Sequence, residues 1–352
     1  MEQKSVLIGM SGGVDSSVAA ALLKEQGYHV IGATMRLWTY SDSCNMKHEG
    51  CCAESAVEDA RRVCDKLGID FYVMNFKDMF KDKVVDYFVD EYIHGRTPNP
   101  CIACNKYLKF DALLKKALAM GIDYVATGHY ARIEKGEDGK YILRASEAVK
   151  KDQSYVLYNF TQEQLAHTLM PLGGYNKDWV RQKAEELGLG VAHKPDSQEI
   201  CFVEDDDYAK FITDYSGYKP KEGDILDVNG NVIGKHRGLI YYTIGQRKGI
   251  GAYGRPMFVM KIDAENNTIT LGEKGMEFSN ELTAYDVNFV SGEFPKENML
   301  ITAKVRYQAP PAAAMSGWMP WRPRSPRWRM PFPKAKPSVS AMPMTFSASW
   351  RR

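Results

Sequence analysis

The sequence predicts an α/β protein built on a parallel sheet, and two observations support this fold class. In the first 200 residues, short apolar runs alternate with amphipathic segments of helical spacing, as in a parallel sheet with helices on both faces. Beyond residue 204 the pattern changes to short apolar runs separated by turn residues such as Asn229 and Gly230, which is typical of a smaller β-rich domain. With 352 residues, 44% of them hydrophobic, the chain can form two or three domains.

The expected elements of the first domain follow one another in regular order. Strands are predicted at residues 4–10, 29–35, 71–75 and 124–129, and helices at 18–26, 54–67, 84–94 and 109–120. Ligands of parallel sheets bind beyond the carboxyl ends of the strands. Those ends predict one site that contains Ser11, Met35, Arg36, Gly128 and His129.

The turn after the first strand is the most informative stretch. Gly12 and Gly13 permit backbone conformations that a Cβ forbids, and Asp15, Ser16 and Ser17 are predicted N-caps of the first helix. The N–H groups and the positive dipole end of that helix would bind an anion. The stretch matches neither G-x-x-x-x-G-K-[ST] nor G-x-G-x-x-G, and an ordinary strand-to-helix turn is the alternative. Asp and Ser at these offsets favour a site for nucleotide phosphates.

Charge and composition change abruptly near the end of the chain. Residues 298–352 contain ten Lys or Arg and no Asp or Glu, so residues 1–297 carry a net charge of −8 although the whole chain carries +2. Residues 309–352 also hold four of the six Trp and nine of the sixteen Pro, without apolar periodicity. This stretch is either a basic disordered extension that binds nucleic acid, or the product of a reading-frame shift between about Gln308 and Ser316, which we prefer. The predicted domains are residues 1–204, 205–277 and 278–308, followed by an aberrant tail, 309–352.

Apolar runs and cysteines bear on the compartment. No run of about 18 apolar residues occurs, and seven unevenly placed Cys do not resemble the disulfide framework of a small secreted domain. We therefore expect a soluble cytoplasmic protein with reactive or metal-binding thiols. The spacing of Cys44, Cys51 and Cys52 lacks the paired C-x2-C of common zinc sites, so no metal is predicted there.

Two other thiols are candidates for chemistry. Cys104 ends a C-x2-C motif, just before the helix expected at 109–120, and nearby Lys106 together with the helix dipole would lower its pKa. Zinc binding and redox chemistry are interpretations of comparable weight for this motif alone. Cys201 lies between two apolar residues, where a single Cys is most often a buried spacer.

Several motifs together resemble one known family. They occur in the order SGGVDSSV, NPCIACN, TGHYAR, KDQSYVLY, KPDSQEICF and IGQRKGIG, over about 300 residues. This series is similar to the tRNA-specific 2-thiouridylase family, whose first domain is a Rossmann-like PP-loop ATP pyrophosphatase domain. The resemblance implies a β-rich central domain and a C-terminal β-barrel, of which this chain would keep only the start.

The resemblance also implies a reaction. Relatives of this kind adenylate the C2 oxygen of wobble uridine 34 with ATP and Mg2+, and a persulfide sulfur then displaces AMP. It implies that Cys201 carries the persulfide, that Cys104 is the nucleophile, and that a Cys104–Cys201 disulfide forms as 2-thiouridine leaves. The implied partners are tRNAs of the Lys, Glu and Gln type and a cysteine desulfurase or sulfur-relay protein as donor, without a membrane.

Site residues are implied in the same way. The ATP set comprises Gly9, Met10, Ser11, Gly12, Gly13, Val14, Asp15, Ser16, Met35 and Gly128. The tRNA set comprises Asn99, Pro100, Cys101, His129, Lys150, Lys151, Asp152, Tyr307 and Gln308. The basic loop 245–251 could also contact tRNA phosphates or be a plain surface turn.

One departure from the family leaves alternatives open. Many members have Asp at the position of Cys101, so the role of this residue is in doubt. Cys101, Cys104 and Cys201 could instead hold an iron-sulphur cluster that presents the sulfur. Two other functions remain: another PP-loop adenylating enzyme of the amidotransferase-type synthetase class, and a non-catalytic, ATP-responsive RNA-binding protein.

Overall fold

The computed structural model describes residues 3–38, 54–148, 151–196, 200–203, 206–276, 279–284, 286–293, 299–304, 306–307, 311–319 and 327–335. The chain divides into two compact units. Unit 1 comprises Met1–Val85, Pro100–Val203 and Asn288–Glu293, and unit 2 comprises Asp86–Asn99, Glu204–Val287 and Phe294–Arg352. The sequence-based domain boundaries stay a prediction.

Unit 1 is built on the predicted parallel sheet. Its five strands have the order β3-β2-β1-β4-β7, and each pair of neighbours is parallel. The first strand therefore lies in the middle, between β2 and β4, so the carboxyl ends of these three strands are adjacent. The strands are β1 Ser5–Gly9, β2 His29–Arg36, β3 Asp70–Asn75, β4 Tyr124–Ala126 and β7 Thr168–Leu169.

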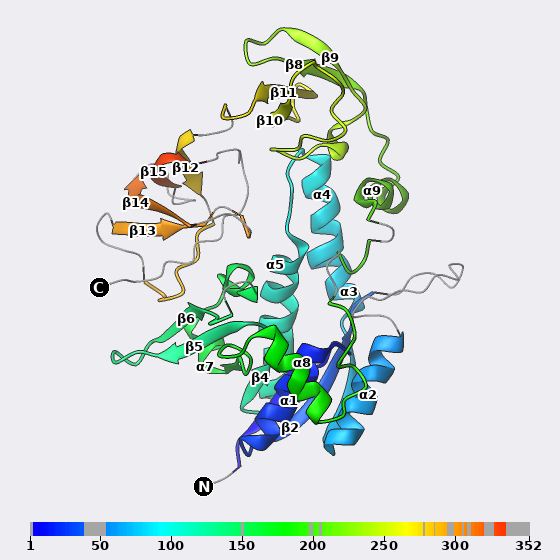
Figure 1. The fold of residues 1–352 in the computed structure, drawn as a ribbon, viewed down its shortest axis with the longest axis vertical. Helices are drawn as coiled ribbons and strands as arrows, with labels where there is room; N and C mark the ends of the chain where they lie inside the picture. The colour runs from blue at the N-terminus through cyan, green and yellow to red at the C-terminus, as the bar shows by residue number, and fades with distance from the viewer. Residues whose placement is uncertain are drawn as a thin grey trace. The chain divides into compact units, whose positions relative to one another are not determined.

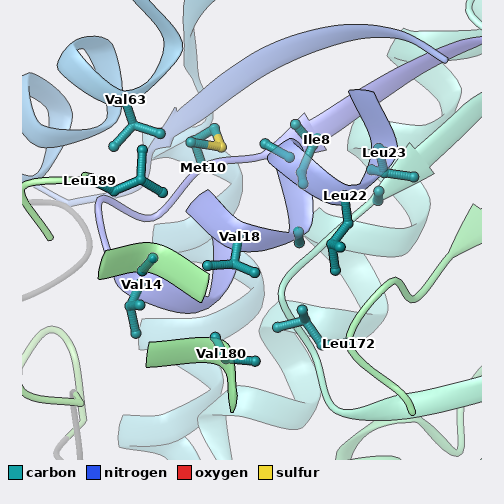
Figure 2. Packing of buried hydrophobic residues seen from close by; sticks show 14 of the residues in the cluster. Ile8, Met10, Val14, Val18, Leu22, Leu23, Val63, Leu172, Val180 and Leu189 are labelled. Carbon is teal, nitrogen blue, oxygen red and sulfur yellow. The ribbon is translucent and has the colours of Figure 1, made fainter. Parts of the chain in front are cut away.

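Three helices share a core with one face of this sheet. They are α1 Val14–Glu25, α2 Glu54–Leu67 and α8 Lys177–Glu186, and α1 lies beside α8 (Figure 1). Figure 2 shows side chains of α1 among those of the neighbouring elements, including Ile8 of β1, Val63 of α2 and Val180 of α8. Each of these is almost completely buried, so the helix that follows the glycine-rich turn shares its core with β1, α2 and α8.

Two long helical stretches begin earlier than the sequence predicts. The segment predicted at 84–94 is a run of α3 Lys77–Phe80, the π-helix η1 Lys81–Asp86 and α4 Tyr87–Ile93. The segment predicted at 109–120 consists of α5 Pro100–Cys104, the π-helix η2 Asn105–Ala112 and α6 Leu113–Ala119. Cys104 therefore lies at the end of helix α5, and the expectation that it precedes the helix is wrong. Proline fits the first position of a helix, because the N–H that it lacks has no partner there.

Smaller elements of unit 1 follow β4. The strands β5 Ala131–Lys135 and β6 Tyr141–Ala145 form an antiparallel hairpin. Then come the short 3-10 helix η4 Ser154–Leu157 and the helix α7 Gln162–Ala166, whose N-cap Thr161 and residue Gln164 form a capping box. After α7, the chain rejoins the parallel sheet as β7, which pairs with β4.

Unit 2 contains the predicted β-rich region. Its first sheet has the order β10-β11-β8-β9 around a core that includes Val259, Ile269 and Leu271. The elements are α9 Tyr208–Ser216, β8 Gly223–Leu226, β9 Val232–His236, the 3-10 helix η5 Leu239–Tyr241, β10 Met257–Asp263 and β11 Thr268–Glu273.

A second sheet of unit 2 includes part of the basic tail. Its order is β12-β15-β14-β13, with β12 Ser279–Ala284, β13 Met299–Ala303, β14 Ala312–Met319 and β15 Arg327–Ala335. Strands β14 and β15 thus lie in the tail, where the sequence shows no apolar periodicity. Backbone pairing with strands that precede the tail forms this sheet, and such pairing does not require an alternating apolar pattern.

Candidate active site

The glycine-rich turn and the first helix differ from the prediction in one respect. Helix α1 begins at Val14 with Gly13 as its N-cap, so Asp15, Ser16 and Ser17 lie in its first turn and are not N-caps. The hydroxyls of Ser16 and Ser17 donate to the Gly13 carbonyl at 3.2 and 2.8 Å. Because Val14 is buried on the same helix face as Val18, core packing extends the helix to the turn.

Close backbone approaches determine which residues fit in this turn. Gly12 has φ +68°, and a Cβ there would lie 2.2 Å from the carbonyl oxygen of Ala56. A Cβ on Gly128, just beyond β4, would lie 2.7 Å from the amide nitrogen of Ser16. The turn is also closed by its own hydroxyl, because the Ser11 N–H donates to Ser16 Oγ at 3.2 Å. Ser11 and Gly128 therefore both lie against Ser16.

Strand β2 is joined to the same turn. The N–H of Met10 donates to the carbonyl of Ala33 at 2.8 Å, and Thr34 Oγ1 donates to the carbonyl of Met10 at 2.8 Å. Met35 follows directly in β2. Beyond it, a cavity of about 400 Å³ lies at the carboxyl ends of β2 and β3, with Arg36, Arg61 and Lys77 among its lining residues. This is the edge of the sheet where a nucleotide is expected.

The turn fits a phosphate group. Glycine at the N-cap has no side chain to accept hydrogen bonds from the first N–H groups of a twelve-residue helix. Those groups and the helix dipole favour a negatively charged ligand. The glycines leave room for it to approach the backbone closely. The residues present therefore suit the triphosphate of ATP.

A charged network, formed by Asp15, Lys151, Lys177 and Asp196, connects this turn with two later motifs. Lys177, the first residue of α8, contacts both carboxylate oxygens of Asp15 at 2.8 Å and Asp196 at 2.6 Å. Lys151 contacts the other oxygen of Asp196 at 2.7 Å. Although burial raises the pKa of Asp196, Lys151 and Lys177 lower it overall, so this carboxylate is ionised at neutral pH. The motifs SGGVDSSV, KDQSYVLY and KPDSQEICF are thereby joined by ion pairs.

Lys194 makes a second connection to the turn. Its ammonium group donates to the carbonyl of Gly12 at 3.1 Å and to Asp59 of α2 at 2.8 Å. Burial raises the pKa of Asp59, but Lys194 and Arg62 lower it more. Lys194 and Asp196 lie close in sequence, so both anchors of the turn are in the segment that leads to Cys201.

The predicted thiols occupy three environments. Cys104 is buried at the end of α5, Cys101 is exposed, and Cys201 is half-buried. The residue after Cys201 is Phe202, a fully buried ring that packs against Phe80 with centroids 5.7 Å apart and against Trp38 at 6.4 Å. The Cys201 segment is thus held by the ion pairs of Asp196 on one side and by an aromatic cluster on the other.

The helix that carries Cys104 is bonded to the KDQSYVLY segment. Asn105, the next residue, is buried and donates from Nδ2 to the carbonyl of Val156 at 3.1 Å. Its Oδ1 is a buried acceptor for which the described residues provide no hydrogen-bond donor. The same segment is bonded to TGHYAR, because Gln153 exchanges two hydrogen bonds with the backbone of Tyr130 at 2.8 and 2.9 Å.

Two of the residues predicted to bind tRNA, His129 and Asp152, have local contacts that the structure describes. His129 Nδ1 lies 2.7 Å from Thr127 Oγ1, and burial and then Lys109 lower the pKa of this His well below 6.5, so it is neutral at pH 7. Asp152 accepts hydrogen bonds from Ser154 and Ser146, which gives it a local structural role. Lys150 and Gln308 lie outside the described residues.

Side chains that could ligate a metal ion do not cluster among the described residues. Among them, no group of three or more His, Cys, Asp or Glu side chains is close enough to hold a metal ion, and this includes Cys101, Cys104 and Cys201. Cys44, Cys51 and Cys52 lie outside the described part of the chain. Within that part, no helix has the length and apolar character needed to cross a membrane.

The sequence analysis did not select several residues of this site. Lys177 and Lys194 contact the turn directly, and Tyr130 donates its hydroxyl proton to Asp15 at 2.7 Å. Burial and the nearby Asp15 carboxylate raise the pKa of Tyr130, so it remains a donor. Lys194 and Tyr130 belong to motifs that the sequence analysis quoted, whereas Lys177 carries no sequence signal.

The fold and the site together define a class. A parallel sheet whose central strand leads through a glycine-rich turn into a buried helix, with the turn suited to a phosphate, is a nucleotide-binding α/β domain of the PP-loop type. Residues 4–205 match the family model described as tRNA methyl transferase HUP domain, and residues 209–273 match the tRNA methyl transferase PRC-barrel domain.

Named relatives identify the family within this class. The chain is 58% identical to the tRNA-specific 2-thiouridylase MnmA of Acetivibrio thermocellus over 90% of this chain and 89% of that one. It is 59% identical to the enzyme of the same name from Clostridioides difficile, over 88% of this chain and 86% of that one. A solved 4-thiouridine synthetase–RNA complex with bound ATP shares 18% identity over 56% of this chain and 45% of that one, with a TM-score of 0.38, too distant to add to the assignment. The chain belongs to the tRNA-specific 2-thiouridylase family.

Proposed function

We propose that this chain converts uridine 34 of tRNA to 2-thiouridine in an ATP-dependent reaction. The observation that carries the proposal is the set of contacts between the phosphate-binding turn and the Cys201 segment. Lys194 contacts Gly12, and Lys177 joins Asp15 to Asp196. An enzyme that activates an oxygen with ATP and then replaces it with sulfur needs these two parts at one site.

The first step is the activation of an oxygen that is otherwise a poor leaving group. The C2 oxygen of the uridine attacks the α-phosphorus of ATP, pyrophosphate leaves, and the oxygen becomes part of an AMP leaving group. The residues proposed to hold ATP are the turn residues from Gly9 to Ser16, with Met35 and Gly128. Mg2+ is proposed to screen the phosphate charges.

The second step is sulfur transfer. The terminal sulfur of a persulfide on Cys201 attacks C2, and AMP leaves. The Cys104 thiolate then attacks Cys201 Sγ, so that the bond to the transferred sulfur breaks and a Cys104–Cys201 disulfide forms. A thiol reductant then reduces the disulfide to two thiols and is itself oxidised. A persulfide donor of the desulfurase or sulfur-relay class forms the persulfide on Cys201 again. Half-burial of Cys201 supports this role, because the sulfur must be accepted from a partner and then protected from water.

The substrate contacts remain part of the proposal. Asn99, Pro100 and Cys101 are proposed to contact the target base, and Cys101 is exposed. His129, Lys150, Lys151, Asp152, Tyr307 and Gln308 are proposed to contact tRNAs of the Lys, Glu and Gln type. A thiolate-bound iron-sulphur cluster gains no support from the arrangement of the three described Cys.

Single-turnover thiolation tests the proposal. The full chain is incubated anaerobically with ATP, Mg2+, a persulfide-generating desulfurase and unmodified tRNA, and digested tRNA is analysed for 2-thiouridine by mass spectrometry. We expect thiolation by the unmodified chain and by Cys64→Ala, and none by Cys201→Ser. Cys64 is the matched control because it is fully buried in α2, where burial raises the pKa of its thiol to about 12.

Other outcomes point to other functions. Thiolation that survives Cys201→Ser would contradict the persulfide role of this residue. ATP-dependent adenylation of a small amide or acid without thiolation of tRNA would favour another adenylating enzyme of the PP-loop class. Binding of RNA without AMP formation would favour a non-catalytic protein.

A further inference from the structure

The helix that carries Cys104 changes its type directly after this residue. Helix α5 ends at Cys104, and the π-helix η2 continues from Asn105 to Ala112. π-Helices are rare and occur frequently at functional sites. Because the two helix types place successive side chains at different angles about the axis, the position of this junction determines how Cys104 is oriented relative to the rest of the helix.

The side chain of Asn105 anchors the junction. Asn105 is 3% exposed, and its Nδ2 donates to the carbonyl of Val156 in η4 at 3.1 Å. Its Oδ1 is a buried acceptor that receives no hydrogen bond within the described part of the chain. An unpaired buried acceptor costs free energy, so an apolar residue of similar shape would serve stability nearly as well. The presence of Asn therefore indicates a need for the hydrogen bond that it donates.

A ring contact attaches the π-helix to the same stretch of chain. Phe110 of η2 packs against Phe160 with ring centroids 4.5 Å apart, and both rings are almost completely buried. Val156 and Phe160 lie in the stretch 154–160, which comprises η4 and the three residues after it. The start and the interior of η2 are therefore held by one stretch, so the position of this stretch sets that of the junction.

Asn288 fixes the stretch 154–160 from a distant part of the sequence. Its Nδ2 donates to the carbonyls of Tyr158 and Phe160 at 2.7 and 3.0 Å. An amide group carries two hydrogens, so one side chain can make both bonds. The stretch is thus bonded to Asn105 at one carbonyl and to Asn288 at two others.

The segment that carries Asn288 has anchors of its own. It comprises residues 288–293, which belong to unit 1 although the residues before and after them belong to unit 2. The carbonyl of Val290 accepts a hydrogen bond from Gln162 Nε2 at 2.6 Å. The side-chain amide of Gln162 also exchanges two hydrogen bonds with the backbone of Tyr141 in β6, both at 2.8 Å. The segment is therefore fixed to unit 1 by contacts other than those of Asn288.

We propose that Asn105 and Asn288 are positioning residues that hold Cys104 in the orientation for its attack on Cys201. Asn105 attaches the Cys104 helix to the stretch 154–160, and Asn288 fixes that stretch. A disulfide requires a narrow range of Cβ–Cβ distances and dihedral angles, so a small movement of the junction is enough to slow its formation. The inference rests on the proposed function for the reaction in which Cys104 takes part.

The reactivity of two thiols within one molecule tests this inference. The full chain is treated with excess iodoacetamide, and alkylation of each Cys is followed by site-resolved mass spectrometry. Asn105→Leu keeps the branched shape but lacks the donor, so we expect Cys104, which is buried in the unmodified chain, to be alkylated about 5-fold faster. Cys64 is the internal reference because it is fully buried in α2, and its alkylation rate should not change.

The variant Asn288→Asp has a matched control in unit 2. The substitution removes the amide that donates to two carbonyls, and we expect alkylation of Cys104 to be about 2-fold faster, because the change reaches this thiol only indirectly. Asn267, like Asn288, is half-buried and donates from Nδ2 to a backbone carbonyl, at 2.8 Å. Asn267→Asp should leave the alkylation rate of Cys104 unchanged.

A second measurement separates positioning from a loss of stability. The reduced chain is mixed with excess oxidised glutathione. One protein thiolate displaces a glutathione thiolate to form a mixed disulfide, and the other then displaces the second glutathione to form the Cys104–Cys201 disulfide. We expect Asn105→Leu to form this disulfide about 5-fold more slowly, although its Cys104 is alkylated faster. A general loosening of the fold would accelerate both reactions, because both require access to the thiol.

Several results would overturn the proposal. Unchanged alkylation of Cys104 in both Asn105→Leu and Asn288→Asp would show that the two Asn side chains do not hold this thiol. An equal acceleration at Cys64, or in Asn267→Asp, would reduce the effect to stability. Single-turnover thiolation by the unmodified chain, measured in parallel, separates the two proposals: without it the proposed reaction fails, although the alkylation rates still establish or exclude the anchoring of Cys104.

Discussion

Two glycine-rich loops of this protein need glycine for different reasons. In the turn around Gly12, glycine provides space, because a Cβ would lie 2.2 Å from a backbone oxygen of α2. In the loop 245–251, Gly249 provides only a backbone conformation, and the nearest atom to an added Cβ is a flexible side-chain nitrogen of Gln246 at 3.8 Å. The backbone of the first loop is in close contact with α2, whereas the second loop exposes the side chains of Arg247 and Lys248.

The two loops also differ in whether their charged side chains are paired. Asp15 in the first turn of α1 is paired with Lys177 and bonded to Tyr130. The second loop presents Arg247 and Lys248 without described ion-pair partners. The carboxylate of the first loop is thus neutralised by a neighbouring cation, whereas no described carboxylate pairs with the two cations of the second loop.

The strongest test of this comparison is one methyl group in each loop. Gly12→Ala adds a Cβ at φ +68° against the Ala56 carbonyl, and we expect ATP-dependent AMP formation to fall by about 100-fold through displacement of the turn. Gly249→Ala should lower the free energy of unfolding by only about 1 kcal/mol, since it meets conformational strain without a backbone clash. Both variants are measured for AMP release and by urea unfolding. An equal loss of AMP formation in the two variants would contradict the distinction between the loops.

A smaller effect is expected from the charged network of the first loop. Lys177→Met leaves Asp15 and Asp196 without their shared cation, and because the Lys side chain is only 12% exposed we expect a loss of about 2 kcal/mol, less than for a fully buried pair. Urea unfolding measures this loss, and the KM for ATP should rise. Lys183→Met in the same helix breaks a more exposed pair with Glu25 and serves as the control. A similar loss in both variants would argue against a special role for Lys177.

The smallest effect lies at the opposite end of the sheet from the site. Lys4, then the backbone and hydroxyl of Ser5, lower the pKa of Asp123 from 3.8 to about 2. Because the folded-state pKa is the lower one, this carboxylate contributes stability above about pH 4, and the contribution is lost as pH falls toward 2. Asp123→Asn should therefore lose less stability than the unmodified chain on acidification through that window, measured by urea unfolding at several pH values. Identical pH profiles would contradict the assignment, and AMP formation at neutral pH should change little.

The sequence predicted the order of elements in unit 1 well, because apolar periodicity and turn residues record how each segment is buried. The strand β2 and the helix α2 appear close to the predicted bounds. Helix starts were less predictable. Helix α1 begins four residues earlier than expected because Val14 packs in the core. Helix α5 begins at Pro100 because proline is acceptable at a first helical position.

By itself, the sequence determined the class of fold, the glycine-rich turn after the first strand and the membership of the family, because each depends on residues that are adjacent in the chain. Only the tertiary structure decided that Lys177 and Lys194 hold this turn, that Asp196 joins it to the Cys201 segment, and that Arg306 meets the basic loop. Lys177 lies 162 residues from Asp15, and such a contact leaves no periodic trace in the sequence. The physical reason is that backbone preferences and burial are local properties of a chain, whereas ion pairs between distant segments form only after the sheet has brought them together.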